Sequence, residues 1–190
     1  MRRFFNREQG YRPIDLLHAA TDHLFSATVL FSSGDFFRVI GALDIDTEAP
    51  RCLDSAGYLS HLGIELTLKA FWLHHSGKFS DSHSLATIVR NLQKEGLELA
   101  LSADHMATLR RLDQFYSLRY PQTAVSPAVG DLDWDAIHSL FSALGDQLPK
   151  ELQRDLRNLD RTKKFGRILM RKMKDTRLFE GRMIVVETKK

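Results

Sequence analysis

The chain has 190 residues, of which 43% are hydrophobic, with one cysteine, Cys52, and a formal net charge of +3. This length fits one domain with extensions, or at most two small domains, and the apolar content can fill a core. A single cysteine excludes an internal disulfide framework, and the apolar run at residues 24–31 is too short and too polar to span a bilayer. We therefore expect a soluble, cytoplasmic protein that does not associate with membranes.

The charge is distributed unevenly along the chain. Residues 1–12 carry a net +3, residues 13–149 a net −8, and residues 150–190 a net +8. Two interpretations of this asymmetry stay open. The basic C-terminal part folds back onto the acidic body, or it meets an anionic partner such as nucleic acid.

The first half of the chain predicts two long helices. Apolar residues recur at helical spacing over residues 14–31, and Gly34 is expected to end that helix. The segment that follows is less regular and is expected to hold a short helical or extended piece and then an acidic loop. A second helix is predicted over residues 49–76, with Gly77 as its stop. Its two apolar stripes indicate that neighbouring helices surround it.

Three shorter helices are predicted next, over residues 84–95, 102–118 and 133–147. Each has a candidate capping side chain at its start: Ser82 or Ser84, Ser102, and Asp133. The segment "RYPQTAVSPAVGD" between the last two is predicted to be a loop, because it contains two prolines and a glycine.

A basic segment begins at Pro149, and its apolar spacing continues the helical pattern, while "GRMIVVET" near the end favours a short strand. The fold class predicted from all these elements is all-α, an up-down bundle of five or more helices with a basic C-terminal helical extension. We place the bundle in residues 1–148 and the extension in residues 149–190.

Three segments in the middle of the chain resemble the HEPN domain family. "GIELTLKAFWL" resembles the family's second helix, in which a Glu and a Lys four residues apart lie among apolar residues. "SHSLATIVRNL" is similar to the His-x-Leu-x-x-Leu segment that follows, and "LRRLDQFYSLRYP" resembles the helix that ends in Tyr-x-x-Arg-Tyr-Pro. The three occur in the family's order and together cover about residues 56–121.

The resemblance implies a helical bundle that is commonly a homodimer. Many HEPN domains act in RNA cleavage, toxin–antitoxin pairs and antiviral defence, and others are binding partners of nucleotidyltransferases. RNA or a nucleotide is therefore the implied ligand, and a nucleotidyltransferase or an antitoxin is the implied protein partner.

Glu65 and Lys69 are the first candidate site residues. They lie four residues apart, so on a helix their side chains share a face and can neutralise each other. One interpretation is that the pair only fixes helix packing. The other is that it joins His83, Arg119 and Tyr120, which the resemblance brings to the same polar cluster, and that the cluster binds phosphate.

Ribonucleases of the family carry an Arg followed by a His after four to six residues. Arg12 and His18 have this spacing, but they lie at the N-terminus, whereas the family's motif opens a late core helix. They are weak catalytic candidates, and whether the protein is an enzyme stays open. We predict a HEPN-type module that binds an anionic partner; the alternatives are a HEPN-type ribonuclease with an atypical active site and a purely structural interaction module.

No metal site or cofactor is predicted. His61 and Glu65, and likewise His18 and Asp22, have the spacing of helical metal ligands, but a metal site needs three or four ligands. The glycines are scattered, so no phosphate-binding glycine loop is present.

The basic extension provides a second set of candidates, for contact with nucleic acid. As a helix it would be amphipathic, with one apolar and one cationic face. One interpretation is a surface helix docked on the acidic body; the others are contact with phosphates, or with a membrane surface or protein partner. The cationic candidates are Lys163, Lys164, Arg167, Arg171, Lys172 and Lys174.

Overall fold

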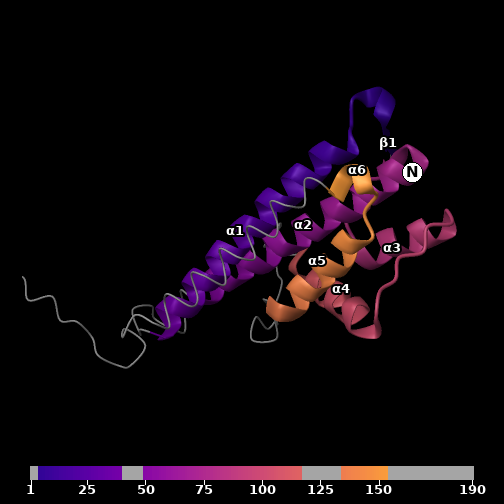
Figure 1. Cartoon of the computed structure of the whole chain (residues 1–190). Coiled ribbons are helices and arrows are strands. Elements are labelled where there is room, and N and C mark those ends of the chain that lie inside the picture. The colour runs from indigo at the N-terminus through magenta and orange to yellow at the C-terminus, as the bar shows by residue number, and fades with distance from the viewer. Residues whose placement is uncertain (1–3, 40–48, 117–133, 154–190) are drawn as a thin grey trace, which may run out of the picture.

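The computed structural model describes residues 4–39, 49–116 and 134–153, without the side chains of residues 32–39 and 49–53. Helices dominate these residues, which confirms the all-α fold class (Figure 1). The elements are β1 (Phe4–Asn6), the 3-10 helix η1 (Arg7–Gln9), α1 (Pro13–Val39), α2 (Ala49–Ser76), β2 (Lys78–Ser80), α3 (Leu85–Lys94), α4 (Ala103–Phe115), α5 (Trp134–Asp146) and α6 (Lys150–Gln153).

Helices α1 and α2 form a long hairpin and lie side by side along their length (Figure 1). Small residues allow this close approach. A Cβ atom added at Gly63 would lie 2.5 Å from Cγ of Leu24 and 3.1 Å from the carbonyl oxygen of Ala20. A larger side chain at Gly63 would therefore push the two helices apart.

The first helix is longer than the sequence indicated. Gly34 does not end α1, which continues to Val39, so the segment expected to be irregular supplies the last helical turn. A single glycine inside a helix costs only about 1 kcal/mol relative to alanine, and a long helix tolerates this cost. The second helix has the bounds that the sequence predicted.

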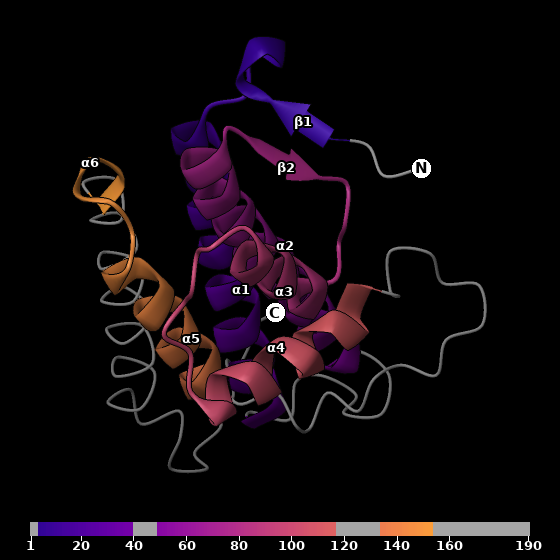
Figure 2. The same ribbon diagram turned by 90° about the vertical axis from the view of Figure 1, so that its right-hand side faces the viewer.

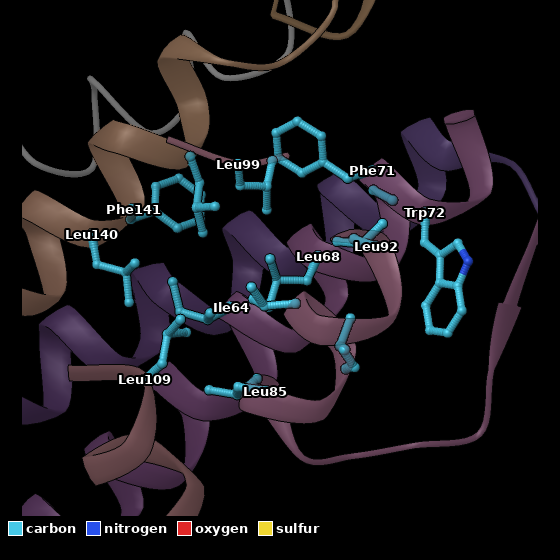
Figure 3. Packing of buried hydrophobic residues seen from close by; sticks show 14 of the residues in the cluster. Ile64, Leu68, Phe71, Trp72, Leu85, Leu92, Leu99, Leu109, Leu140 and Phe141 are labelled. Carbon is cyan, nitrogen blue, oxygen red and sulfur yellow. The ribbon is translucent and has the colours of Figure 1, made fainter. Parts of the chain in front are cut away.

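Helices α3, α4 and α5 pack against α2 and bury its apolar residues (Figures 2 and 3). Ile64 and Leu68 are fully buried, and Leu109 of α4 and Phe141 of α5 join them in one core. The predicted caps Ser84 and Ser102 are confirmed, since each hydroxyl accepts a hydrogen bond from a backbone N–H of its helix.

A two-stranded ribbon, β1–β2, stands at the end of the bundle where α2 stops (Figure 2), and the sequence did not reveal it. Phe5 pairs with Phe79 across the ribbon, and their rings stack at 5.3 Å. Arg7 donates hydrogen bonds to the carbonyl oxygens of Leu73 and His74. These carbonyl groups lie in the last turn of α2, where the helix itself supplies no donor for them. Strands of three residues show too little alternation to be recognised in the sequence.

Several predictions lie outside the described residues: the cap at Asp133, the loop over 119–131, the helix beyond residue 153 and the terminal strand. The boundary at residue 149 stays a prediction as well. Among the described helices, none has the length and apolar character needed to cross a membrane.

Candidate functional site

The middle of α2 holds a buried ion pair. Nζ of Lys69 lies 2.6 Å from Oε1 of Glu65, and the two side chains are only 6% and 4% exposed. The ring of Phe79 covers the ammonium group, with its centre 5.6 Å from Nζ. A buried charge is costly unless an opposite charge compensates it, so each residue depends on the other. The sequence predicted this neutralisation, and the structure confirms it.

His83 joins the pair from the segment between β2 and α3, one residue before the helix cap. Its Nδ1 lies 3.0 Å from Oε1 and 3.2 Å from Oε2 of Glu65. A carboxylate only accepts hydrogen bonds, so Nδ1 carries a proton and donates a hydrogen bond to Glu65. Nε2 makes no hydrogen bond to any described residue, and 37% of the side chain is exposed. His83 is therefore the member of the cluster that reaches solvent.

His61 extends the cluster toward α4. Its side chain is completely buried, with Nδ1 3.9 Å from Glu65 and Nε2 3.4 Å from Oδ1 of Asp113. Neither nitrogen makes a well-aligned hydrogen bond to a described residue. The ring of Tyr116 lies 5.5 Å from that of His61 and stacks on His83 at 4.9 Å. The two histidines thus share an aromatic neighbour and a carboxylate.

Asp113 of α4 is hydrogen-bonded to the start of α3. Its carboxylate accepts hydrogen bonds from the backbone N–H groups of Leu85 (2.7 Å) and Ala86 (3.3 Å) and from the hydroxyl of Ser84 (3.0 Å). Desolvation raises the pKa of Asp113, but the interaction with His61 and these hydrogen bonds outweigh it, so the pKa lies below its ordinary value. The cluster therefore connects α2, α3 and α4.

Asp113 and Tyr116 were not predicted from the sequence as members of the cluster. A signal was present for Asp113, which follows Leu109 by four residues and so lies near the inward face of α4. A carboxylate in that position needs a partner. The partners come from other elements, which a single sequence does not place.

The predicted phosphate-binding residues differ in their exposure to solvent. Glu65 and Lys69 are covered, whereas His83 is partly open. Arg119 and Tyr120 lie outside the described residues, three and four positions after Tyr116 in the sequence. The six cationic candidates of the extension, Lys163 to Lys174, also lie outside them.

The weak catalytic candidates are on the surface at the start of α1. The guanidinium group of Arg12 makes two hydrogen bonds to Asp15, of 2.7 and 2.6 Å, and 71% of its side chain is exposed. This hydrogen-bonded pairing lowers the pKa of Asp15. His18 is also exposed. Arg12 is thus already engaged by a carboxylate.

The two helical pairs with metal-ligand spacing, His61–Glu65 and His18–Asp22, are not joined by further potential ligands among the described residues. Among the described residues, no group of three or more His, Cys, Asp or Glu side chains is arranged to hold a metal ion. His61 and Glu65 instead belong to the hydrogen-bonded and ionic cluster described above.

A family model, the HEPN domain, matches residues 51–143. The match spans α2 to α5 and includes every member of the cluster. Comparison with curated proteins and with solved structures found no match. The resemblance seen in the sequence is confirmed: residues 51–143 match the model of the HEPN domain family.

Proposed function

We propose that this HEPN domain is a binding module for an anionic, phosphate-bearing ligand, and that His83 contacts the ligand. The observation that carries the proposal is the orientation of His83. Glu65 engages Nδ1 at 3.0 Å, and Nε2 is left without a hydrogen bond to any described residue on a partly exposed side chain. When the ring is doubly protonated, Nδ1–H stays on Glu65 and Nε2–H can donate a hydrogen bond to a phosphate oxygen.

Lys69 and Glu65 support His83 without touching the ligand. Lys69 is 5% exposed, and Phe79 lies over its ammonium group, so it is not open to a phosphate. Its charge balances that of Glu65 at 2.6 Å. An unbalanced carboxylate beside His83 would repel an anion, and the repulsion would be strong in a partly buried environment. We therefore assign both residues a positioning role.

Arg119 and Tyr120 complete the proposed site. In the sequence Arg119 follows Tyr116, the residue whose ring stacks on His83, by three positions. An arginine in this region can form two parallel hydrogen bonds to one phosphate group. The family match covers this segment and supports the assignment.

We propose the class of partner from the resemblance to the family. RNA, a nucleotide, or a partner protein such as a nucleotidyltransferase or an antitoxin would suit a HEPN-type module. The protein would then act as a homodimer in the cytoplasm, as part of a toxin–antitoxin or defence system. The strongly basic sequence of residues 150–190 supports an additional contact with phosphates.

A ribonuclease with an atypical active site is the second candidate. The contact between Glu65 and His83 favours it, because a carboxylate that orients an imidazole is an arrangement used in general acid–base catalysis. In this form of the proposal, His83 would exchange a proton with the RNA, and Arg12 and His18 would have no part.

The test is calorimetric titration of the full chain with pyrophosphate, a nucleoside triphosphate and a short RNA. Charge-assisted hydrogen bonds contribute about 1.5–3 kcal/mol, so His83→Ala is expected to weaken binding by about tenfold or more. His18→Ala is the matched control, since it removes an exposed histidine of α1. The same panel incubated with RNA tests cleavage, which His83→Ala should abolish if the second candidate is correct.

Equal affinity of His83→Ala and His18→Ala would contradict the proposal. If wild-type protein binds none of the three ligands, the module is structural.

A further inference from the structure

His61 is the member of the cluster whose surroundings the proposed function does not explain. It is completely buried, yet neither ring nitrogen makes a hydrogen bond to a described residue. A buried polar group without a partner is costly and calls for an explanation. Carboxylates lie on both sides of the ring, with Glu65 3.9 Å from Nδ1 and Asp113 3.4 Å from Nε2. A ring with one proton can donate to only one of these carboxylates, whereas a ring with two protons can donate to both.

The charged groups around His61 leave the cluster with an excess of one negative charge while both histidines are neutral. Two carboxylates, of Glu65 and Asp113, face one ammonium group, of Lys69. Although desolvation raises it, the pKa of Asp113 lies below its ordinary value, so this carboxyl is ionised at neutral pH. Tyr116 contributes an aromatic face, and among the described residues α1 contributes no ion pair to His61. One proton added to a histidine therefore neutralises the cluster, and a second makes it positive.

Both histidines of the cluster can accept that proton. His83 is hydrogen-bonded to Glu65 from the solvent side at 3.0 Å, and His61 lies against Glu65 from the buried side. Both rings pack on Tyr116, with ring centres 4.9 Å away for His83 and 5.5 Å for His61. Asp81, two residues before His83, is the other charged residue of that segment. Charges this close interact strongly where water is excluded, so a proton on one ring opposes a proton on the other.

We propose that His61 and His83 share one positive charge across Glu65, and that His61 thereby sets the pH range in which His83 binds phosphate. The inference rests on the proposed function, in which Nε2–H of a doubly protonated His83 contacts the ligand. When phosphate binds, one proton leaves Nδ1 of His61 and one is added to Nε2 of His83, so the cluster keeps the same number of protons. His61 then retains the proton on Nε2, on the side of Asp113.

The direction of the pH effect follows from this competition. In the wild type, the charge that phosphate requires on His83 is also drawn to His61, which lies between two carboxylates. Without His61 the charge has only His83 to occupy, so phosphate binding should persist to higher pH. A purely structural role for His61 would change the affinity or the stability and would leave the shape of the pH profile as it is.

The first test is calorimetric titration of the full chain with pyrophosphate at several pH values. In His61→Phe, the pH at which affinity falls to half should be higher than in the wild type by about one pH unit, the coupling at which two groups titrate in separate steps. His61→Gln should give the same shift, because glutamine does not titrate either, and it replaces the phenylalanine variant if that one does not fold. Pyrophosphate also titrates, but equally for every variant.

The matched control is His75→Gln, which removes an exposed histidine of the same helix and should leave the profile unchanged. An unshifted profile in both His61 variants would overturn the inference. So would a shift of equal size in His75→Gln, since the effect would then be one of general charge.

The second test needs no ligand. Nitrogen NMR of the imidazole rings reports the protonation of each histidine as the pH changes. In the wild type the signals of His61 and His83 should each change in two steps, as those of coupled groups do, and in His61→Phe the signal of His83 should change in one step. Independent single-step changes of both rings in the wild type would contradict the shared charge.

The two proposals fail separately. If pyrophosphate binding depends on His83 but its pH profile ignores His61, the phosphate site stands and the shared charge is wrong. If the two rings titrate in coupled steps while His83→Ala binds pyrophosphate as the wild type does, the charge is shared and the phosphate site is wrong.

Discussion

Two ion pairs in this molecule have the same contact distance and different surroundings. Arg12 and Asp15 meet at 2.6 Å at the start of α1, and Lys69 and Glu65 meet at 2.6 Å inside α2. The first pair is 71% and 47% exposed, and the second is 6% and 4% exposed. Water and salt compete with the first, whereas in the second each ion has lost most of its water and depends on its partner. Burial, and not distance, distinguishes them.

The comparison also separates two candidate sites. The exposed pair involves the arginine of the ribonuclease-like spacing, which Asp15 already engages. The buried pair continues through Glu65 to His83, the one member of its cluster that is markedly open to solvent. A buried charge network is by itself weak evidence that it stabilises the fold. The contact between the network and His83 therefore says more about function than the network says about stability.

The largest expected effect is from breaking the buried pair. Lys69→Met should destabilise the fold by about 3–5 kcal/mol, because Glu65 would be left as an uncompensated buried charge. Urea unfolding followed by circular dichroism measures this change. A loss below about 1 kcal/mol, as is typical of a surface pair, would show that the two environments are equivalent.

A smaller loss is expected from the contact that holds α4 against the cluster. A Cβ atom at Gly57 would lie 2.4 Å from Cδ1 of Phe115, whose ring is buried and cannot move aside easily. Gly57→Ala should therefore cost about 1–3 kcal/mol and displace Asp113 from His61. Ser55→Ala, on an exposed position of α2, is the control and should stay within about 0.5 kcal/mol of wild type. Equal stabilities of the two variants would contradict the close approach of α2 and α4.

Asp113 lies between the two pairs in exposure, and its effect should depend on pH. Its pKa is lowered in the folded state, so its carboxylate stabilises the fold above the ordinary carboxyl pKa of about 3.9, and this contribution is lost as the pH falls through the folded value. Asp113→Asn should destabilise the protein by about 1–2 kcal/mol at pH 7 and by less below about pH 4. Thermal melts of both proteins from pH 3 to pH 7 measure the gap. A gap that stays constant over this pH range would mean that the charge of Asp113 does not stabilise the fold.

The smallest effect belongs to the exposed pair. Arg12→Ala should leave the urea midpoint unchanged and should not alter binding or cleavage of RNA. Loss of RNA cleavage in Arg12→Ala or His18→Ala would instead restore the N-terminal residues as catalytic candidates.

The helices were predictable because their signals are local. The apolar spacing of α2 and the hydroxyls of Ser84 and Ser102 predicted where helices lie or begin, and the structure confirms them. The extension of α1 beyond Gly34 was not predictable from the sequence. A glycine lowers the helix propensity locally, but the sequence does not show whether packing of the rest of a long helix outweighs that cost. The ribbon was missed because its strands are too short to show a pattern.

The candidate site was predictable in part for the same reason. Glu65 and Lys69 lie on one helix, so their spacing alone predicted that they meet. The positions of His61 and Asp113 depend on how α4 packs against α2, and the sequence had suggested only a weak metal-ligand pattern for His61. Contacts between elements distant in sequence require the fold.

The most direct test of the central claim replaces both buried ions with apolar residues of similar volume. The double variant Glu65→Leu, Lys69→Met should be much more stable than Lys69→Met, because no uncompensated charge remains, yet His83 would lose the carboxylate that orients it. Calorimetric titration with pyrophosphate should then show affinity reduced by about tenfold or more in a folded protein. Wild-type affinity in this double variant would contradict the claim that the buried pair serves to position His83.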